Sequence, residues 1–538
     1  MIAQPDLMVI NARIWTGEPS LPYAEALAIK DDLILAIGSN DQIRSIRGQH
    51  TKVLDAAGHL VLPGFIDNHT HLMVGGFQLL SLDLREVKSK EEFVQTIAAR
   101  AANIPSGHWI TGGGWNNDQW AQSQTPVKDW IDSFTSHIPV FITRSDLHIG
   151  FANSAAHRLA EIDRTTANPM GGVIERDPYT GEPTGILKDN AMKLVQQCIP
   201  TPSKQQYNEA LMAAMQHAAR MGITSVQDIT AWRDWNDWET FLRFQQQQKL
   251  TLRIYARTQI TEWKKQLVLM EAGFCGDAWL RFGGVKGFVD GSLGSGTALM
   301  LEPYDDVPGT AGLLADQMYP EGIMRERIAA ADKAGLPVSI HAIGDKANHL
   351  LLDIFEAVIK ENGPRDRRFR IEHAQHLLPD DITRMARLGI LASVQPGHVY
   401  EDGCWAKKRI GDRRCQMAYA FRSLLDAGVE VSFGTDWPVV PLNPFFGIYT
   451  AITRQTQDGQ YPDGWVPEQK LSVRECLQAY TSGSAYAEFS ETMKGTLRAG
   501  KFADLILVSK DVLSAPPEDI PKTRVLWTIA GGKIVYQE

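Results

Sequence analysis

Five apolar runs along this chain of 538 residues lead into side chains that can bind a metal ion. The first run, 60–62, leads through Pro63 and Gly64 to the pair His69 and His71. Residues two apart on a strand point to the same side, so both imidazoles leave the strand end together, as a metal site requires. One such pair is a weak signal, whereas an ordered series constrains the fold. The later runs carry, in chain order, Lys286, His341, His373 and Asp436.

Eight strand-like runs alternate with helical stretches such as 323–333 and 380–388. Continuous apolar strands that alternate with helices predict a parallel sheet covered on both faces. Eight such units predict an α/β fold of the (β/α)8, TIM-like barrel type, whose active site lies at the C-terminal ends of the strands. The predicted strands are 60–67, 223–228, 252–256, the run around Val285, 336–341, 369–373, 390–395 and 429–436.

The predicted barrel, residues 60–494, has two additions. The interval 68–222 between its first two strands is several times what one crossover helix needs. It contains strand-like runs at 108–111 and 139–143, so we expect an inserted α/β subdomain over about 80–205. Short strand-like runs at both ends of the chain predict a small β-sandwich built from 1–59 and 495–538.

The composition argues against nucleic acid or an anionic membrane as a partner. The chain is 44% apolar and 22% charged, and its net charge is −9, which disfavours polyanionic partners. No apolar window approaches the length of a membrane span, and the start has no signal-peptide pattern. The five cysteines are scattered, without Cys-x-x-Cys spacing, which fits reduced thiols. We therefore expect a cytoplasmic protein that acts on a small molecule.

The ligand order His, His, Lys, His, His, Asp resembles the metal-dependent amidohydrolase superfamily. Further motifs are similar to its YtcJ-like branch, which includes N-substituted formamide deformylases, and the terminal runs at 501–505 and 531–535 resemble the terminal sandwich of the same superfamily. One departure is Gly296, where we expect relatives to carry arginine, and it bears on the substrate rather than on the metal site. The motifs are those at 290–295, 341–345, 370–375, 393–396 and 434–438.

The resemblance implies a binuclear metal centre. In such a centre His69 and His71 bind one ion, and His341 and His373 bind the other. A free lysine ammonium would repel metal ions, and the resemblance implies that Lys286 reacts with CO2 to a carbamate that bridges both. Asp436 then binds the first ion and acts as general base and later general acid. Imidazole and carboxylate ligands suit zinc, the expected metal.

Each candidate ligand also has a structural alternative. The two histidines of the first strand could cap a turn, His341 and His373 could be core histidines, and Asp436 could be a helix N-cap. Lys286 could be an ordinary lysine, either paired with Asp290 or extending its ammonium group out of the barrel mouth, which would leave the site mononuclear or differently bridged.

Five residues are candidate substrate contacts. His398 follows the seventh strand and has a structural role as its alternative, and relatives have a histidine similar to His148 in the insertion. The aromatic ring of Trp115 would favour an apolar substrate group, although most tryptophans in such a chain are core residues. Gln227 and Asp228 either face the pocket or close a turn. The five candidates are His148, Trp115, Asp290, Gln395 and His398.

Three functions from different classes follow. The leading prediction is hydrolysis of a carbon–nitrogen, non-peptide amide bond in a small molecule, such as an N-substituted formamide or another N-acyl compound. The alternative is a mononuclear deaminase of a heterocyclic or amidine substrate. Superfamily deaminases usually carry a glutamate three residues after the fifth-strand histidine, whereas this chain has Gly344 there. The third is a non-catalytic binding module, against which the complete ligand set counts. The sandwich and the insertion are two surfaces that could support a homodimer.

Overall fold

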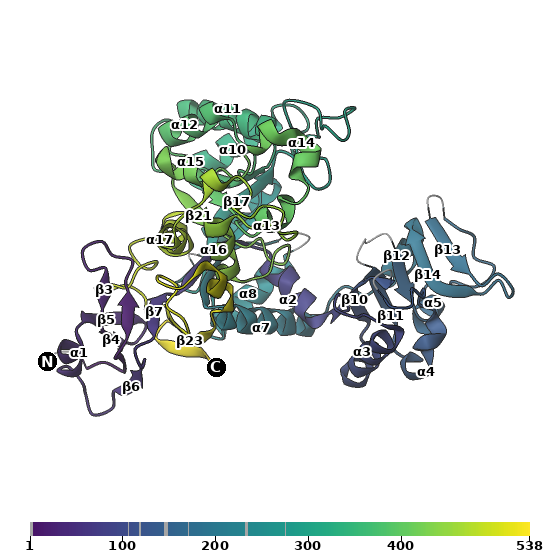
Figure 1. Ribbon diagram of the computed structural model, residues 1–538, viewed down its shortest axis with the longest axis horizontal. Coiled ribbons are helices and arrows are strands. Elements are labelled where there is room, and N and C mark those ends of the chain that lie inside the picture. The colour runs from purple at the N-terminus through teal and green to yellow at the C-terminus, as the bar shows by residue number, and fades with distance from the viewer. Residues whose placement is uncertain are drawn as a thin grey trace. The chain divides into compact units, whose positions relative to one another are not determined.

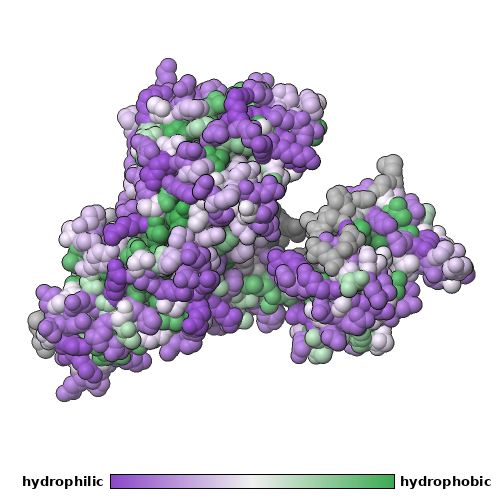
Figure 2. All heavy atoms as spheres, viewed as in Figure 1, coloured by the Kyte–Doolittle hydropathy of each residue, from purple (hydrophilic) through white to green (hydrophobic). Residues whose placement is uncertain are grey.

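The computed structural model describes residues 4–105, 107–117, 120–144, 149–169, 172–231, 235–274 and 276–538. The chain forms two compact units (Figure 1). The larger consists of Met1–Leu72 and Ala214–Glu538 and the smaller of Met73–Ala213, where the sequence predicted an insertion over about 80–205. Among the described residues no helix is long and apolar enough to cross a membrane. Hydrophilic residues cover most of the face of each unit shown in Figure 2.

The larger unit contains an eight-stranded sheet in which every neighbouring pair is parallel. The sheet closes between its first and last strands, where the Asp436 amide donates to the His69 carbonyl at 2.8 Å. The predicted (β/α)8 barrel is thereby confirmed. Its strands, in sheet order, are β8 (Phe65–Thr70), β15 (Ile223–Ile229), β16 (Arg253–Gln259), β17 (Leu280–Phe288), β18 (Val338–Ala342), β19 (Arg370–His373), β20 (Leu391–Val394) and β21 (Val431–Phe433).

Helices follow most of these strands. The expected helix at 323–333 is α10 (Ile323–Lys333), and the one at 380–388 is α12 (Pro379–Leu388). Helix α12 begins with proline and is followed by Gly389 in the left-handed conformation. These residues define its two ends, because proline suits a helix start and glycine a helix end. Barrel strands are also followed by α8 (Asn236–Gln246), α9 (Trp263–Glu271), α11 (Asp345–Asn362), α14 (Ala406–Cys415) and α16 (Pro444–Thr453).

Two further sheets of the larger unit form the sandwich. The strand β7 (Leu60–Pro63) pairs antiparallel with β22 (Leu505–Val508), so the two ends of the chain share one sheet. Its order is β24 (Lys533–Gln537), β23 (Val525–Ala530), β22, β7, β2 (Arg13–Trp15) and β3 (Tyr23–Ala24). The second sheet has the order β5 (Leu33–Gly38), β4 (Ala26–Lys30), β1 (Leu7–Ile10) and β6 (Lys52–Asp55). Aliphatic side chains from both sheets, such as Val9 and Leu505, form one buried cluster.

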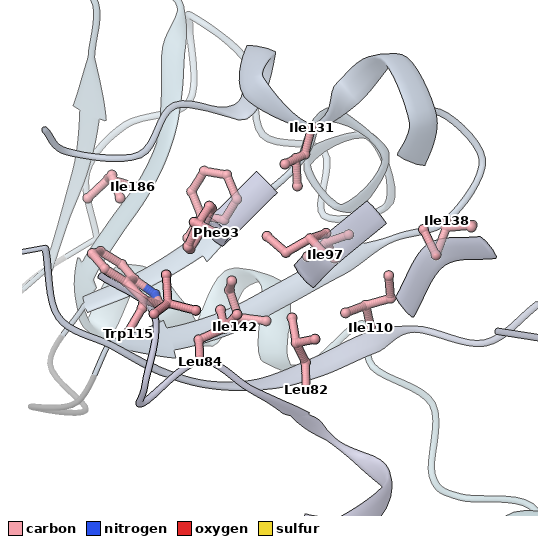
Figure 3. Close-up of a cluster of buried hydrophobic side chains, with 14 of the residues drawn as sticks. Leu82, Leu84, Phe93, Ile97, Ile110, Trp115, Ile131, Ile138, Ile142 and Ile186 are labelled. Carbon is pink, nitrogen blue, oxygen red and sulfur yellow. The ribbon is translucent and has the colours of Figure 1, made fainter. Parts of the chain in front are cut away.

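The smaller unit has a six-stranded mixed sheet and its own core. Phe93 of α3 (Lys90–Asn103) packs edge-on against Trp115 at a centroid distance of 6.1 Å (Figure 3). Trp115 is 1% exposed within this core. The strand order is β13 (Gly172–Arg176), β14 (Pro183–Asp189), β12 (Ile149–Ala152), β11 (Val140–Arg144), β10 (Ile110–Trp115) and β9 (Leu82–Asp83). The smaller unit is thus a separately packed α/β subdomain, as we predicted from the sequence.

Candidate metal centre

Three predicted ligands meet where the barrel closes. His69 and His71 lie at the end of β8, and Asp436 follows β21. Asp436 Oδ1 lies 3.4 Å from His69 Nε2 and 3.3 Å from His71 Nε2. One ligand atom from each residue fits within 4.8 Å of the others, a grouping that can hold a metal ion. The triad joins the first and last strands of the sheet.

Two more histidines lie on the other side of His69. The ring of His373, at the end of β19, lies 4.8 Å from that of His69 between centroids. The ring of His341, on the neighbouring strand β18, lies 4.5 Å from that of His373. All three are buried. The structure therefore brings the four predicted histidine ligands to one end of the barrel.

The backbone at two of these ligands is strained. His373 has φ 75° and Asp436 has φ 60°, values in the left-handed region that non-glycine residues rarely adopt. Asp67 holds the backbone just before Asp436, because its carboxylate accepts from the Thr435 amide at 3.0 Å and from the Thr435 hydroxyl at 2.6 Å. Such strain persists only where the surroundings enforce it, and it concentrates at functional sites.

Lys286 is the unusual member of the set. It lies on β17, is 1% exposed, and places Nζ 4.9 Å from the centre of the Phe288 ring. Burial lowers the pKa of Lys286 from its usual 10.5 to about 8, although the charges of Glu372 and Asp436 act in the opposite direction. With this pKa, roughly a tenth of the amine is neutral at pH 7, far more than for an exposed lysine.

Each buried histidine has one ring nitrogen beside a protein acceptor. His69 Nδ1 lies 2.6 Å from Glu372 Oε2, and His341 Nε2 lies 3.0 Å from the Gly291 carbonyl. His373 Nδ1 lies 2.8 Å from Gln395 Oε1. Burial lowers the pKa of His69 to about 4 and that of His341 to about 3, and the Lys286 charge acts in the same direction. The imidazoles are thus neutral, the form that binds metals.

Asp436 offers an ionised oxygen that suits a cation. Burial alone would raise the pKa of Asp436, but its contacts with His69, His398 and His71 hold it well below its usual value. The imidazole nitrogens of His69 and His71 lie 3.4 and 3.3 Å from its buried Oδ1, and among the described residues no donor meets that oxygen in good hydrogen-bond geometry. A buried carboxylate oxygen without a donor is costly, and a metal ion would satisfy it. The donor set therefore fits the expected metal.

The predicted substrate contacts have varied positions. His398 begins α13 (His398–Asp402) and lies at the candidate metal centre, with its Nε2 3.4 Å from Asp436 Oδ2. Gln395 supports His373, as described above. The position of Trp115 in the core of the smaller unit corrects the expectation of an indole open to substrate. His148 lies outside the described residues.

Asp290 is bound by main-chain donors rather than by Lys286. Its carboxylate accepts from the amides of Leu299, Ile343 and Gly344 at 2.8–3.0 Å. The structure thus gives Asp290 the role of holding the loop after β17 against the end of β18, and these bonds stand in place of the alternative in which Asp290 pairs with Lys286.

A buried polar network next to the predicted histidine ligands was not anticipated from the sequence. Its centre is Glu372, which accepts from Arg257 Nη1 at 3.0 Å and Arg370 Nε at 2.7 Å. Gln227 belongs to the network, and Asp228 instead accepts from the Leu72 amide at 2.6 Å. The signal available was two charged residues in the apolar run of β19, spaced two apart and therefore on one side of the strand.

The chain matches known proteins over almost its whole length. A family model described as "Amidohydrolase family" matches residues 52–536. Protein LONG AFTER FAR-RED 3 of Arabidopsis thaliana is 40% identical, covering 99% of this chain and 91% of its own. The putative amidohydrolase YtcJ of Bacillus subtilis is 32% identical over 96% of both chains. The N-substituted formamide deformylase of Arthrobacter pascens is 28% identical, covering 100% of this chain and 99% of its own.

A solved structure shares the architecture. The crystal structure of an uncharacterised metal-dependent hydrolase from Pyrococcus horikoshii superposes with a TM-score of 0.76 at 28% identity. The alignment covers 95% of this chain and 99% of the other. The fold of this chain thus recurs over nearly its whole length in that hydrolase.

Proposed function

Since the chain belongs to the amidohydrolase family, we propose that it hydrolyses the carbon–nitrogen bond of a small, non-peptide amide. The predicted resemblance to this family is confirmed, and the protein is a metal-dependent hydrolase. The finer assignment is an N-substituted formamide or another N-acyl compound. It is supported by the name of the Arthrobacter relative and by the amide chemistry that the site suits.

The observation that carries the proposal is the convergence of His69, His71, His341, His373 and Asp436 at one barrel end. These residues, with Lys286, would hold two divalent ions, for which zinc is the proposed identity. When bound, such ions lower the pKa of water and polarise a carbonyl group. This is the chemistry that amide hydrolysis near neutral pH requires.

Asp436 supplies the proton transfer in the proposed reaction. Its carboxylate accepts a proton as water adds to the amide carbon and delivers it to the departing nitrogen. Water and amide thereby give a carboxylic acid and an amine, and Asp436 returns to its ionised form. The low pKa of Asp436 keeps the group ionised before the reaction. His398 lies against the second carboxylate oxygen and orients it.

Lys286 is proposed to carry a carbamate. Its neutral amine attacks CO2, a nitrogen–carbon bond forms, and one proton leaves to solvent. The product is an anion, which can bridge two cations where an ammonium would repel them. The buried position and lowered pKa of Lys286 support this step, because only the neutral amine is nucleophilic.

The test is a product assay on a panel of N-substituted formamides, N-acyl amines and amino-substituted heterocycles. We expect release of a carboxylic acid and an amine, and a loss of about 10³-fold or more in Asp436→Asn. Asp504→Asn is the matched control, because Asp504 is an equally buried acid that pairs with Arg253 instead. Release of ammonia from the heterocycles alone would refute the amide assignment and favour a deaminase.

A further inference from the structure

Glu372 is the most enclosed acid at the metal centre. It is 0% exposed and precedes His373 on β19. Its Oε2 lies 2.6 Å from His69 Nδ1, the nitrogen opposite the one that faces Asp436. The same oxygen accepts from the hydroxyl of Ser393 on β20. A buried carboxylate therefore holds His69, the first predicted ligand, by the ring nitrogen opposite the one that faces Asp436.

Two buried guanidinium groups fix the other oxygen of Glu372. Oε1 accepts from Arg370 Nε at 2.7 Å and from Arg257 Nη1 at 3.0 Å. Four donors, from β8, β16, β19 and β20, thus surround one carboxylate, so its position and its negative charge are both fixed by the barrel.

A second layer holds the guanidinium groups. Gln227 Oε1 accepts from Arg257 at 2.6 Å and from Arg370 at 2.5 Å, and its amide donates to the Ser484 carbonyl at 2.7 Å. Arg370 Nη2 also donates to the carbonyl of Asn68, the residue before His69, at 3.0 Å. The network therefore holds both the backbone of β8 at Asn68 and the side chain of His69.

We propose that Glu372 is a positioning residue that fixes His69 in the tautomer protonated on Nδ1, with Nε2 directed at the metal. A carboxylate has no hydrogen to donate, so the bond between them exists only if His69 carries its hydrogen on Nδ1. A neutral imidazole has one such hydrogen, and the lone pair of Nε2 is left for the ion. The inference rests on the proposed function, since it takes His69 as a metal ligand.

Gln395 beside His373 provides an internal contrast. An amide can present either its oxygen or its NH2 group to a ring nitrogen, so at Gln395 it is only the 3.3 Å bond from its NH2 group to the Ser393 carbonyl that directs the oxygen to His373. Glu372 permits one tautomer of His69. A charged acceptor behind a ligating histidine also makes the ligand more basic, and loss of such a partner commonly weakens metal binding 10–100-fold.

The test compares Glu372→Gln with Asp504→Asn. Each change replaces one buried, arginine-paired acid with its amide. Asp504, the residue before β22 in the sequence, pairs with Arg253, and none of the hydrogen bonds of its side chain reaches a predicted metal ligand. Zinc affinity is measured by chelator competition on folded, metal-stripped protein. We expect the dissociation constant to rise 10–100-fold in Glu372→Gln and to stay within twofold in Asp504→Asn.

The second measurement needs no variant. Histidine 15N NMR of metal-stripped wild-type protein reports which ring nitrogen of His69 carries hydrogen, and His69→Asn assigns the signal. Hydrogen on Nδ1 is expected. Hydrogen on Nε2, or unchanged zinc affinity in Glu372→Gln, would overturn the inference. Failure of the wild type to bind zinc would instead contradict the proposed function, and the tautomer of His69 could still be read.

Discussion

Replacing Lys286 with methionine should stabilise the metal-free protein. Each tenfold change in a proton equilibrium is worth about 1.4 kcal/mol. Lowering the pKa of Lys286 from 10.5 to about 8 therefore costs the folded state about 3 kcal/mol at pH 7. Methionine has a similar length and no charge, so Lys286→Met should recover about this amount.

The pH dependence gives this prediction its sign. Below about pH 8 the lysine is protonated in the folded and the unfolded protein, so the full cost is present. Between pH 8 and 10.5 the folded protein has lost the proton and the unfolded chain has kept it, so the cost falls as pH rises. It should be about 1.5 kcal/mol at pH 9.5.

The assay is urea unfolding of chelator-treated protein at pH 7 and pH 9.5, followed by tryptophan fluorescence. Lys494→Met is the matched control, because Lys494 is also buried but forms an ion pair with the fully buried Glu488. Its removal leaves that carboxylate short of a partner and should destabilise the protein by about 3 kcal/mol or more. A Lys286→Met protein less stable than wild type, or a difference that does not shrink at pH 9.5, would refute the reasoning.

Three further substitutions probe the centre and the smaller unit. Asp436→Asn should retain the fold but lose at least one metal ion per chain, which metal analysis of the purified variant checks against wild type. Gly434→Ala should reduce metal binding, because the added carbon would lie 2.6 Å from the His69 amide and separate the strands that close the barrel; an unchanged metal content would argue against that strain. Trp115→Ala should destabilise the smaller unit by about 3–5 kcal/mol, seen as an earlier unfolding transition. The zinc affinity of folded Trp115→Ala should match wild type, and a weakened affinity would contradict the core role of this residue.

The barrel and the ligand set were predictable because their signals are local. A strand that ends in His69-Thr70-His71 carries both its apolar pattern and its ligands within a few residues. The same holds for His341, His373 and Asp436, whose order along the chain follows the order of the strands in the barrel.

The supporting residues were not predictable for the opposite reason. Glu372 is held by Arg257, which lies more than a hundred residues away in the sequence and meets it only across the barrel. Gln395 and Asp290 were placed correctly near strand ends, but a sequence does not say whether such a side chain turns toward a substrate, a histidine or main-chain amides. Trp115 shows the same limit, since its glycine-rich surroundings resemble a loop and form the strand β10.

The most direct test of the proposed centre is the metal content of protein purified without chelator, measured together with the mass of the peptide containing Lys286 under non-acidic conditions. We expect about two divalent ions per chain and a mass increase on Lys286 equal to one CO2. One ion per chain with an unmodified Lys286 would contradict the bridged centre.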